Sequence, residues 1–298
     1  MKISQNYQPV KGAPQWFKEN ICQTPETICT QVAGAKVHFL AWNWQALDLP
    51  TIMFVHGFGA HAYWWAYLAP FFSKTFRVVA IDLPGMGRSE PPSEYREDSS
   101  SRAITGIIQH YRLAPVTIIG HSYGGAQSLR AVATNPELFH RILVVDTNIR
   151  LTAEPLIRRL KPKGQHRMNA SLKECMERFR LVPPQINSIK ALEHFIAYHS
   201  CAFSNGGWHW RTDPNCVNSG EIETEALLKS VSIPVDMIFG EKSFLNVDDK
   251  PTRVFQHFPQ AGELRFIAKA GHHVMLDCPL QLVAEIRSLL EPDPALNQ

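Results

Sequence analysis

The chain has 298 residues, of which 45% are hydrophobic and 19% charged, and this length and composition predict a globular protein with one large core. Its 30 Lys and Arg residues nearly balance 27 Asp and Glu residues, so the net charge of +3 does not indicate a nucleic-acid-binding protein. Neither a secretion signal nor a membrane span is predicted, because no segment has the long apolar run that either requires.

We therefore expect a soluble cytoplasmic protein. The six cysteines are scattered without a C-x-x-C pair, which indicates reduced thiols and neither a zinc site nor a redox motif. The thirteen histidines include no H-E-x-x-H or comparable ligand spacing, so no metal is expected.

The apolar pattern along the chain predicts alternating strands and helices. Residues 1–27 read as an N-terminal extension that packs on the core through Trp16 and Phe17. Strands are expected over 28–34 and 36–44, as an opening antiparallel hairpin, and then over 52–55, 78–81, 116–119, 142–145, 234–240 and 263–269. Helices are expected over 62–72, after Ser99 or Ser100, after Ser122, over 224–230 and 252–258, and from Pro279 onward. This order predicts an α/β fold with a doubly wound, mostly parallel, eight-stranded sheet.

Residues 150–225 differ in character from the rest of the chain. They contain no clear buried strand, and two stretches, 172–179 and 189–196, have apolar residues at helical spacing. We therefore expect an inserted helical cap over 150–225, on a core made of residues 28–149 and 226–298.

The most informative stretch is Gly120-His121-Ser122-Tyr123-Gly124, which lies between a β-branched apolar run and a helical pattern. A strand that turns at once into a helix strains its apex residue, and glycines two positions before and after relieve the crowding. Ser122 would then stand clear of the backbone ahead of a helix N-terminus, where a developing oxyanion is stabilised. The alternative is a glycine-rich turn whose serine caps the helix.

Other chemically interesting residues also follow predicted strands: 56–59, Asp82, Asp146, Ser243 and His272. Ligands in doubly wound folds bind beyond the carboxyl ends of the strands, so these positions should lie near one another. The glycines of 82–89 match no phosphate-binding motif and indicate a structural turn.

Over residues 28–291 the chain resembles the α/β-hydrolase superfamily, in particular its capped serine hydrolases of the esterase and lipase type. The matching motifs are HGFG at 56–59, DLPGMGRS at 82–89, GHSYGG at 120–125 and AGHHVMLDCP at 270–279. The resemblance implies that Ser122 is the nucleophile and His272 the base, with His273 as a competing candidate. It also implies an oxyanion hole formed by the backbone N–H groups of Phe58 and Tyr123.

The chain departs from the superfamily at the triad acid. Ser243 occupies the position where the family most often has an aspartate, and a serine cannot carry the charge that stabilises an imidazolium. Some members take the acid from the end of the strand after the elbow helix, which is Asp146 here. A structural capping role is the alternative for Asp146, and Glu241, Asp248 and Asp249 are the other candidate acids near the usual loop.

A serine at the elbow favours acyl transfer to water on a carboxylic ester, lactone or thioester, without a cofactor. Two alternatives remain: a carbon–carbon bond hydrolase of the same fold, and a hydrolase-like binding protein without turnover. Trp208 and Trp210 are candidates for the cap side of the pocket. The basic residues Arg158, Arg159, Lys161, Lys163 and Arg167 could attract an anionic substrate, although a solvated helix face explains them as well. The expected partner is a small ester-like molecule, and the sequence does not indicate an oligomeric state.

Overall fold

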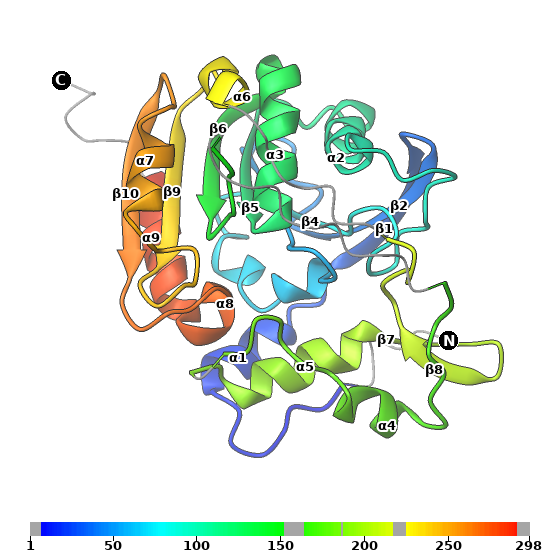
Figure 1. Cartoon of the computed structure of the whole chain (residues 1–298). Coiled ribbons are helices and arrows are strands. Elements are labelled where there is room, and N and C mark those ends of the chain that lie inside the picture. Colours follow the sequence, from blue (N-terminus) through cyan, green and yellow to red (C-terminus); the bar gives the residue numbers. More distant parts are fainter. Residues whose placement is uncertain (1–6, 152–163, 186, 217–224, 291–298) are drawn as a thin grey trace.

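The computed structural model describes residues 7–151, 164–185, 187–216 and 225–290. Its centre is an eight-stranded sheet in the order β1-β2-β4-β3-β5-β6-β9-β10 (Figure 1). β1 pairs with β2 and β2 with β4 in antiparallel fashion, and every other neighbouring pair is parallel. The strands are β1 (Glu26–Val32), β2 (Ala35–Trp42), β3 (Thr51–Val55), β4 (Arg77–Ile81), β5 (Val116–His121), β6 (Phe139–Val145), β9 (Val235–Gly240) and β10 (Ala261–Ile267). The predicted doubly wound sheet is confirmed.

Helices cover both faces of this sheet, because alternate side chains of its buried strands point to opposite sides. Met53 and Val55 of β3 belong to the core under α2, α3, α6 and α7, whereas Ile52 and Phe54 belong to the core under α1 and α9. The core helices are α1 (Gln15–Ile21), α2 (Ser99–His110), α3 (Tyr123–Thr134), α6 (Glu225–Ser230), α7 (Lys250–Phe255), α8 (Val274–Asp277) and α9 (Pro279–Leu290), with 3₁₀ turns η2 (Ala62–Trp64), η3 (Ala69–Phe71) and η4 (Pro136–Leu138).

The prediction of a helix over 62–72 is wrong, since the structure has only η2 and η3 there, joined by turns. The aromatic residues of this segment are buried, except for the partly exposed Phe71, so no solvent-facing stripe favours an amphipathic helix. Pro70 within η3 also lacks the N–H that a continuing helix needs. The N-terminal extension contains α1, whose Phe17 is fully buried in the core beneath Tyr67 and neighbouring aromatic rings.

The segment expected to form a cap, residues 150–225, is called the cap segment below, and its described part contains helices and also a hairpin. Its elements are α4 (Leu172–Glu177), α5 (Lys190–Ser200), β7 (Cys201–Ser204) and β8 (Gly207–Trp210). The two antiparallel strands are joined at Asn205 and Gly206, both with positive φ, as a two-residue hairpin turn requires. The expectation of a purely helical cap therefore missed this hairpin. In Figure 1 these elements lie at the end of the sheet toward which the parallel strands point.

None of the helices in the described ranges has both the length and the apolar character that crossing a bilayer requires. Four members of the basic group, Arg158, Arg159, Lys161 and Lys163, lie outside the described residues.

Candidate active site

Ser122 occupies a sharp turn between β5 and α3. Its backbone has φ 52° and ψ −121°, a conformation that residues other than glycine rarely adopt. Its N–H donates to the carbonyl of Val145 in the neighbouring strand. The side chain makes no capping hydrogen bond to α3, so it does not act as the helix-capping serine of the alternative interpretation. The turn instead leaves Oγ available to other groups.

The flanking glycines are required by close backbone contacts. A Cβ on Gly120 would lie 2.6 Å from the Cα of Gly125, and a Cβ on Gly124 would lie 2.3 Å from the carbonyl oxygen of His56. A side chain at Gly120 would therefore collide with the start of α3, and a side chain at Gly124 would push the elbow away from β3 and its following loop. The glycine pattern thus positions Ser122 against the loop that begins at His56.

His272 lies in the loop between β10 and α8 and joins Ser122 to Asp146. Its Nε2 lies 3.1 Å from Ser122 Oγ, and its Nδ1 lies 2.8 Å from Asp146 Oδ1. The two ring nitrogens thus contact the hydroxyl and the carboxylate on opposite sides of the imidazole. This arrangement can transfer a proton from Ser122 while the carboxylate holds the ring.

Asp146 directly follows β6, has a positive φ of 40°, and is fully buried. Burial raises the pKa of its carboxyl, and the hydrogen bonds from His272, Ser243 and the Gly240 N–H act in the opposite direction. Ser243 Oγ donates to Oδ1 at 2.6 Å, and the Gly240 N–H donates to Oδ2 at 2.7 Å. The carboxylate is therefore held by three donors, one of them the serine that stands at the usual acid position.

The other candidate acids are placed elsewhere. Glu241 is exposed and contacts Lys242 and the N–H of Lys269. Asp248 and Asp249 lie just before α7 with positive φ values of 48° and 54°. Within the described ranges none of these carboxylates contacts His272.

Phe58 and Tyr123 lie next to each other beside Ser122, with ring centres 5.6 Å apart. Tyr123 is the first residue of α3, and the leading N–H groups of a helix point out of its end. The N–H of Phe58 donates no hydrogen bond to any other described residue. A Cβ on Gly57 would lie 3.3 Å from Ser122 Cβ, which shows how closely the loop before Phe58 approaches the serine.

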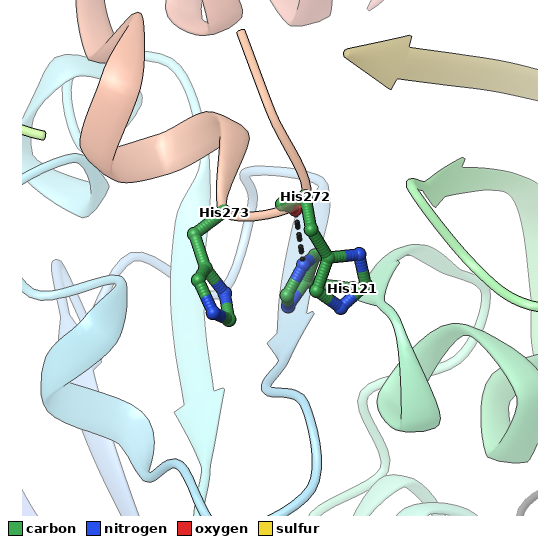
Figure 2. Close-up of side chains that lie close together, drawn as sticks. All are labelled: His121, His272 and His273. Carbon is green, nitrogen blue, oxygen red and sulfur yellow. Dashed lines mark hydrogen bonds between the residues drawn. The ribbon is translucent and has the colours of Figure 1, made fainter. Parts of the chain in front are cut away.

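Two further histidines surround His272, as Figure 2 shows. His121 Nε2 lies 2.9 Å from the His272 carbonyl oxygen, whereas His273 packs edge-on against Trp64 and makes no contact with Ser122 among the described residues. Burial lowers the pKa of His273 to about 3 and that of His121 well below the usual range, and the neighbouring His272 adds to both shifts. Both rings are therefore neutral at pH 7.

One nitrogen from each of His121, His272 and His273 lies within 4.8 Å of the others, and these are the residues in the described ranges that could together hold a metal ion. In the present geometry both nitrogens of His272 face Ser122 and Asp146. Metal binding here would therefore compete with the contact between His272 and Ser122.

Trp208 and Trp210 are placed in β8, away from the described contacts of Ser122 and His272. Trp208 packs against Phe203 across the hairpin, and the Trp210 indole N–H donates to the Cys175 carbonyl. A cavity of about 200 Å³ does open beside His272, between the cap segment, at Pro183, Pro184, Gln185 and Asn187, and the loops that follow β9 and β10. Neither tryptophan lines it.

Sequence reasoning missed two residues of the site. Ser243 was noticed only as a missing aspartate, and no sequence signal indicates that its hydroxyl donates to the Asp146 carboxylate. His121 stands inside the elbow motif, yet its contact with the His272 carbonyl joins residues 151 positions apart. Both contacts depend on tertiary structure alone.

Comparisons with known proteins agree with this architecture. A family model described as the alpha/beta hydrolase fold matches residues 50–185. The chain therefore has the α/β-hydrolase fold. Esterase Rv0045c of Mycobacterium tuberculosis is 22% identical over 272 residues, which cover 88% of this chain and 88% of that protein.

Solved structures show the same fold across most of the chain. The thioesterase domain from the curacin biosynthetic pathway has a TM-score of 0.72 at 21% identity, covering 89% of this chain and 99% of that one. E-2-(Acetamidomethylene)succinate hydrolase has a TM-score of 0.70 at 18% identity, covering 90% of this chain and 100% of that one. The family-model match and the mycobacterial esterase support a hydrolase, whereas these solved structures show the shared fold.

Proposed function

We propose that the protein is a cofactor-free serine hydrolase that cleaves a carboxylic ester, lactone or thioester through an acyl-enzyme on Ser122. The observation that carries this proposal is the placement of His272 between Ser122 Oγ and Asp146 Oδ1, at 3.1 and 2.8 Å. The esterase and thioesterase among its relatives support the same reaction class.

In the proposed reaction Ser122 Oγ attacks the substrate carbonyl while His272 Nε2 takes the hydroxyl proton. Asp146 keeps the other proton on Nδ1, so that Nε2 is the basic nitrogen, and its charge stabilises the imidazolium that forms. The tetrahedral oxyanion lies near the N–H groups of Phe58 and Tyr123, at the leading end of α3. The same proton then passes from Nε2 to the departing alcohol or thiol.

Water completes the cycle by attacking the acyl-enzyme, with Ser122 now the leaving group. His272 Nε2 takes a proton from the water that attacks the acyl-enzyme, and it returns this proton to Ser122 Oγ as the acid product leaves. Each step uses one proton on one imidazole, so no cofactor is required.

Hydrolysis of p-nitrophenyl butyrate by the wild type and by Ser122→Ala tests the proposal. We expect the variant to lose at least a thousandfold in kcat/KM, while Ser230→Ala, an exposed serine on α6, keeps the wild-type value. A panel of vinylogous diketones, measured in parallel, tests the carbon–carbon bond hydrolase. Absence of turnover and of acylation on every ester would favour the binding protein instead.

A further inference from the structure

Two arginines meet where the cap segment contacts the core. Arg88 follows β4, and its guanidinium carbon lies 5.5 Å from the ring centre of Tyr63. Arg211 directly follows β8, and its Nε donates to the carbonyl of His199 at 3.1 Å. The rings of Tyr63 and His199 stack 3.7 Å apart, so these contacts join the two arginines in one cluster. We call Arg88 and Arg211 the arginine pair.

Like charges lie close together in the arginine pair. Burial lowers the pKa of Arg211, the nearby charge of Arg88 lowers it further, and the charge of Asp82 acts in the opposite direction. Neither guanidinium forms an ion pair with a carboxylate in the part of the chain that the structure describes. Two like charges in a half-buried position are costly unless an anion joins them.

The neighbouring carboxylates already have other partners. Asp82 Oδ2 accepts from His38 Nδ1 at 2.6 Å and from the backbone N–H of Arg88 at 2.8 Å, and its Oδ1 accepts from the N–H of Ala62. Asp213 accepts from the hydroxyl of Tyr95 through Oδ2 and from Asn215 through Oδ1. The guanidinium groups thus keep their capacity to bind an anion from outside the chain.

His61 adds an unsatisfied polar atom to this cluster. It is only 3% exposed, and burial lowers its pKa to about 3. Its Nε2 lies 2.9 Å from Ser200 Oγ, and because that hydroxyl donates its proton to the Ile196 carbonyl, the imidazole must be the donor. Nδ1 is therefore a buried acceptor without a partner among the described residues, and a donor such as a water molecule, rather than a carboxylate, would satisfy it.

The arginine pair borders the loop that supplies the proposed oxyanion hole. Thr212, the residue after Arg211, donates through its hydroxyl to the carbonyl of Gly59 at 3.1 Å. Gly59 directly follows Phe58, whose N–H is one of the two proposed oxyanion donors, and its own N–H contacts the sulfur of Met86 at 3.4 Å. The residue after Arg211 and the residue two positions before Arg88 thus both contact Gly59, in the same loop that approaches Ser122.

We propose that Arg88 and Arg211 form a subsite for a carboxylate carried by the substrate. The planar guanidinium fork matches a carboxylate in geometry and charge, and a half-buried site strengthens the pairing. The inference rests on the function proposed for Ser122 and narrows its substrate class to esters or thioesters that bear a second, negatively charged group. If the protein hydrolyses esters without preferring a second negative charge, the proposed function stands and only the inference of an anion subsite fails.

The test compares monoethyl glutarate with ethyl pentanoate, two esters of equal chain length that differ by a terminal carboxylate or methyl group. We expect the wild type to favour the glutarate ester at least tenfold in kcat/KM. Arg88→Gln and Arg211→Gln should each lower this ratio at least tenfold, mainly through KM, and Arg211→Lys should restore part of it. Arg253→Gln, which removes an exposed arginine on α7, is the matched control and should leave the ratio unchanged.

Binding measured without turnover separates this inference from the proposed function. Titration calorimetry of Ser122→Ala with monoethyl glutarate should give a Kd at least tenfold lower than that of the Ser122→Ala, Arg211→Gln double variant. Equal affinities, or a substrate ratio that is at or below one in the wild type, would overturn the inference. If neither ester is hydrolysed but binding still depends on Arg211, the anion subsite stands and the proposed function fails.

Discussion

Replacing Asp146 by asparagine exchanges one carboxylate oxygen for an amide NH₂, at a side chain that accepts hydrogen bonds from three donors. Oδ1 faces His272 Nδ1 and Ser243 Oγ, whereas Oδ2 faces the N–H of Gly240. If the amide oxygen takes the Oδ1 place, the amide NH₂ opposes the Gly240 N–H, donor against donor. The amide is therefore expected to turn its oxygen toward Gly240 and its NH₂ toward His272.

That orientation fixes the wrong tautomer of His272. Nδ1 must then accept a hydrogen bond, the proton moves to Nε2, and Ser122 faces a nitrogen that cannot take its proton. In a serine triad this change costs on the order of 10⁴ in kcat with the geometry kept, equivalent to about 5.4 kcal/mol of transition-state stabilisation. We expect a loss of this size in kcat/KM for p-nitrophenyl butyrate.

The stability of Asp146→Asn distinguishes loss of catalysis from loss of fold. Because burial raises the pKa of Asp146 in the folded chain, its ionised form disfavours folding above the carboxyl pKa of the unfolded chain, and this cost disappears as the pH falls. The variant should therefore melt no lower than the wild type at pH 7. Glu241→Gln, Asp248→Asn and Asp249→Asn are the controls and should stay within about tenfold of wild type, or about 1.4 kcal/mol. A fully active Asp146→Asn beside one inactive control would refute the assignment of the acid.

Three other substitutions or additions test single contacts. Ser243→Ala removes a hydrogen bond that lowers the pKa of Asp146, so the acidic limb of the kcat/KM profile should move to higher pH; an unchanged limb would contradict this role. Gly124→Ala places a Cβ 2.3 Å from the carbonyl oxygen of His56 and should lower the free energy of unfolding by about 1–3 kcal/mol, measured by urea denaturation. Added Zn²⁺ should inhibit the wild type reversibly at the three neighbouring histidines, since one ring nitrogen of each lies within 4.8 Å of the others and binding an ion with Zn–N bonds of about 2.0–2.1 Å would draw His272 away from Ser122. His273→Ala should raise the inhibitory concentration at least fivefold, and equal inhibition of both proteins would place the ion elsewhere.

The sheet could be predicted from the sequence because its strands are short apolar runs bounded by turn residues. β3, β4 and β5 are buried along their whole length, and such strands leave a continuous β-branched or aromatic signal. The elbow could be predicted as well, because its glycines form a local pattern between a strand and a helix. The signals for these features lie in neighbouring residues of the chain, even where a contact, such as that of Gly124 with His56, joins distant segments.

The remaining features depend on contacts between distant segments. The segment 62–71 has the length and apolar content of a helix, but near-complete burial and Pro70 give it 3₁₀ turns instead. The hairpin of β7 and β8 did leave a local signal, the Asn205-Gly206 pair between aromatic residues, which the helical patterns on either side outweighed. The role of Ser243 left no local signal in the sequence. This serine is part of the site only because the fold places its Oγ 2.6 Å from Asp146 Oδ1.

The central claim is a covalent acyl-enzyme on Ser122, and rapid acid quench followed by mass spectrometry measures it directly. After mixing with p-nitrophenyl butyrate, we expect one butyryl group per chain, on the peptide that contains Ser122. The burst of p-nitrophenol should equal the enzyme concentration, and both signals should disappear in Ser122→Ala. A butyryl group on another residue, or an adduct that persists in Ser122→Ala, would contradict the account.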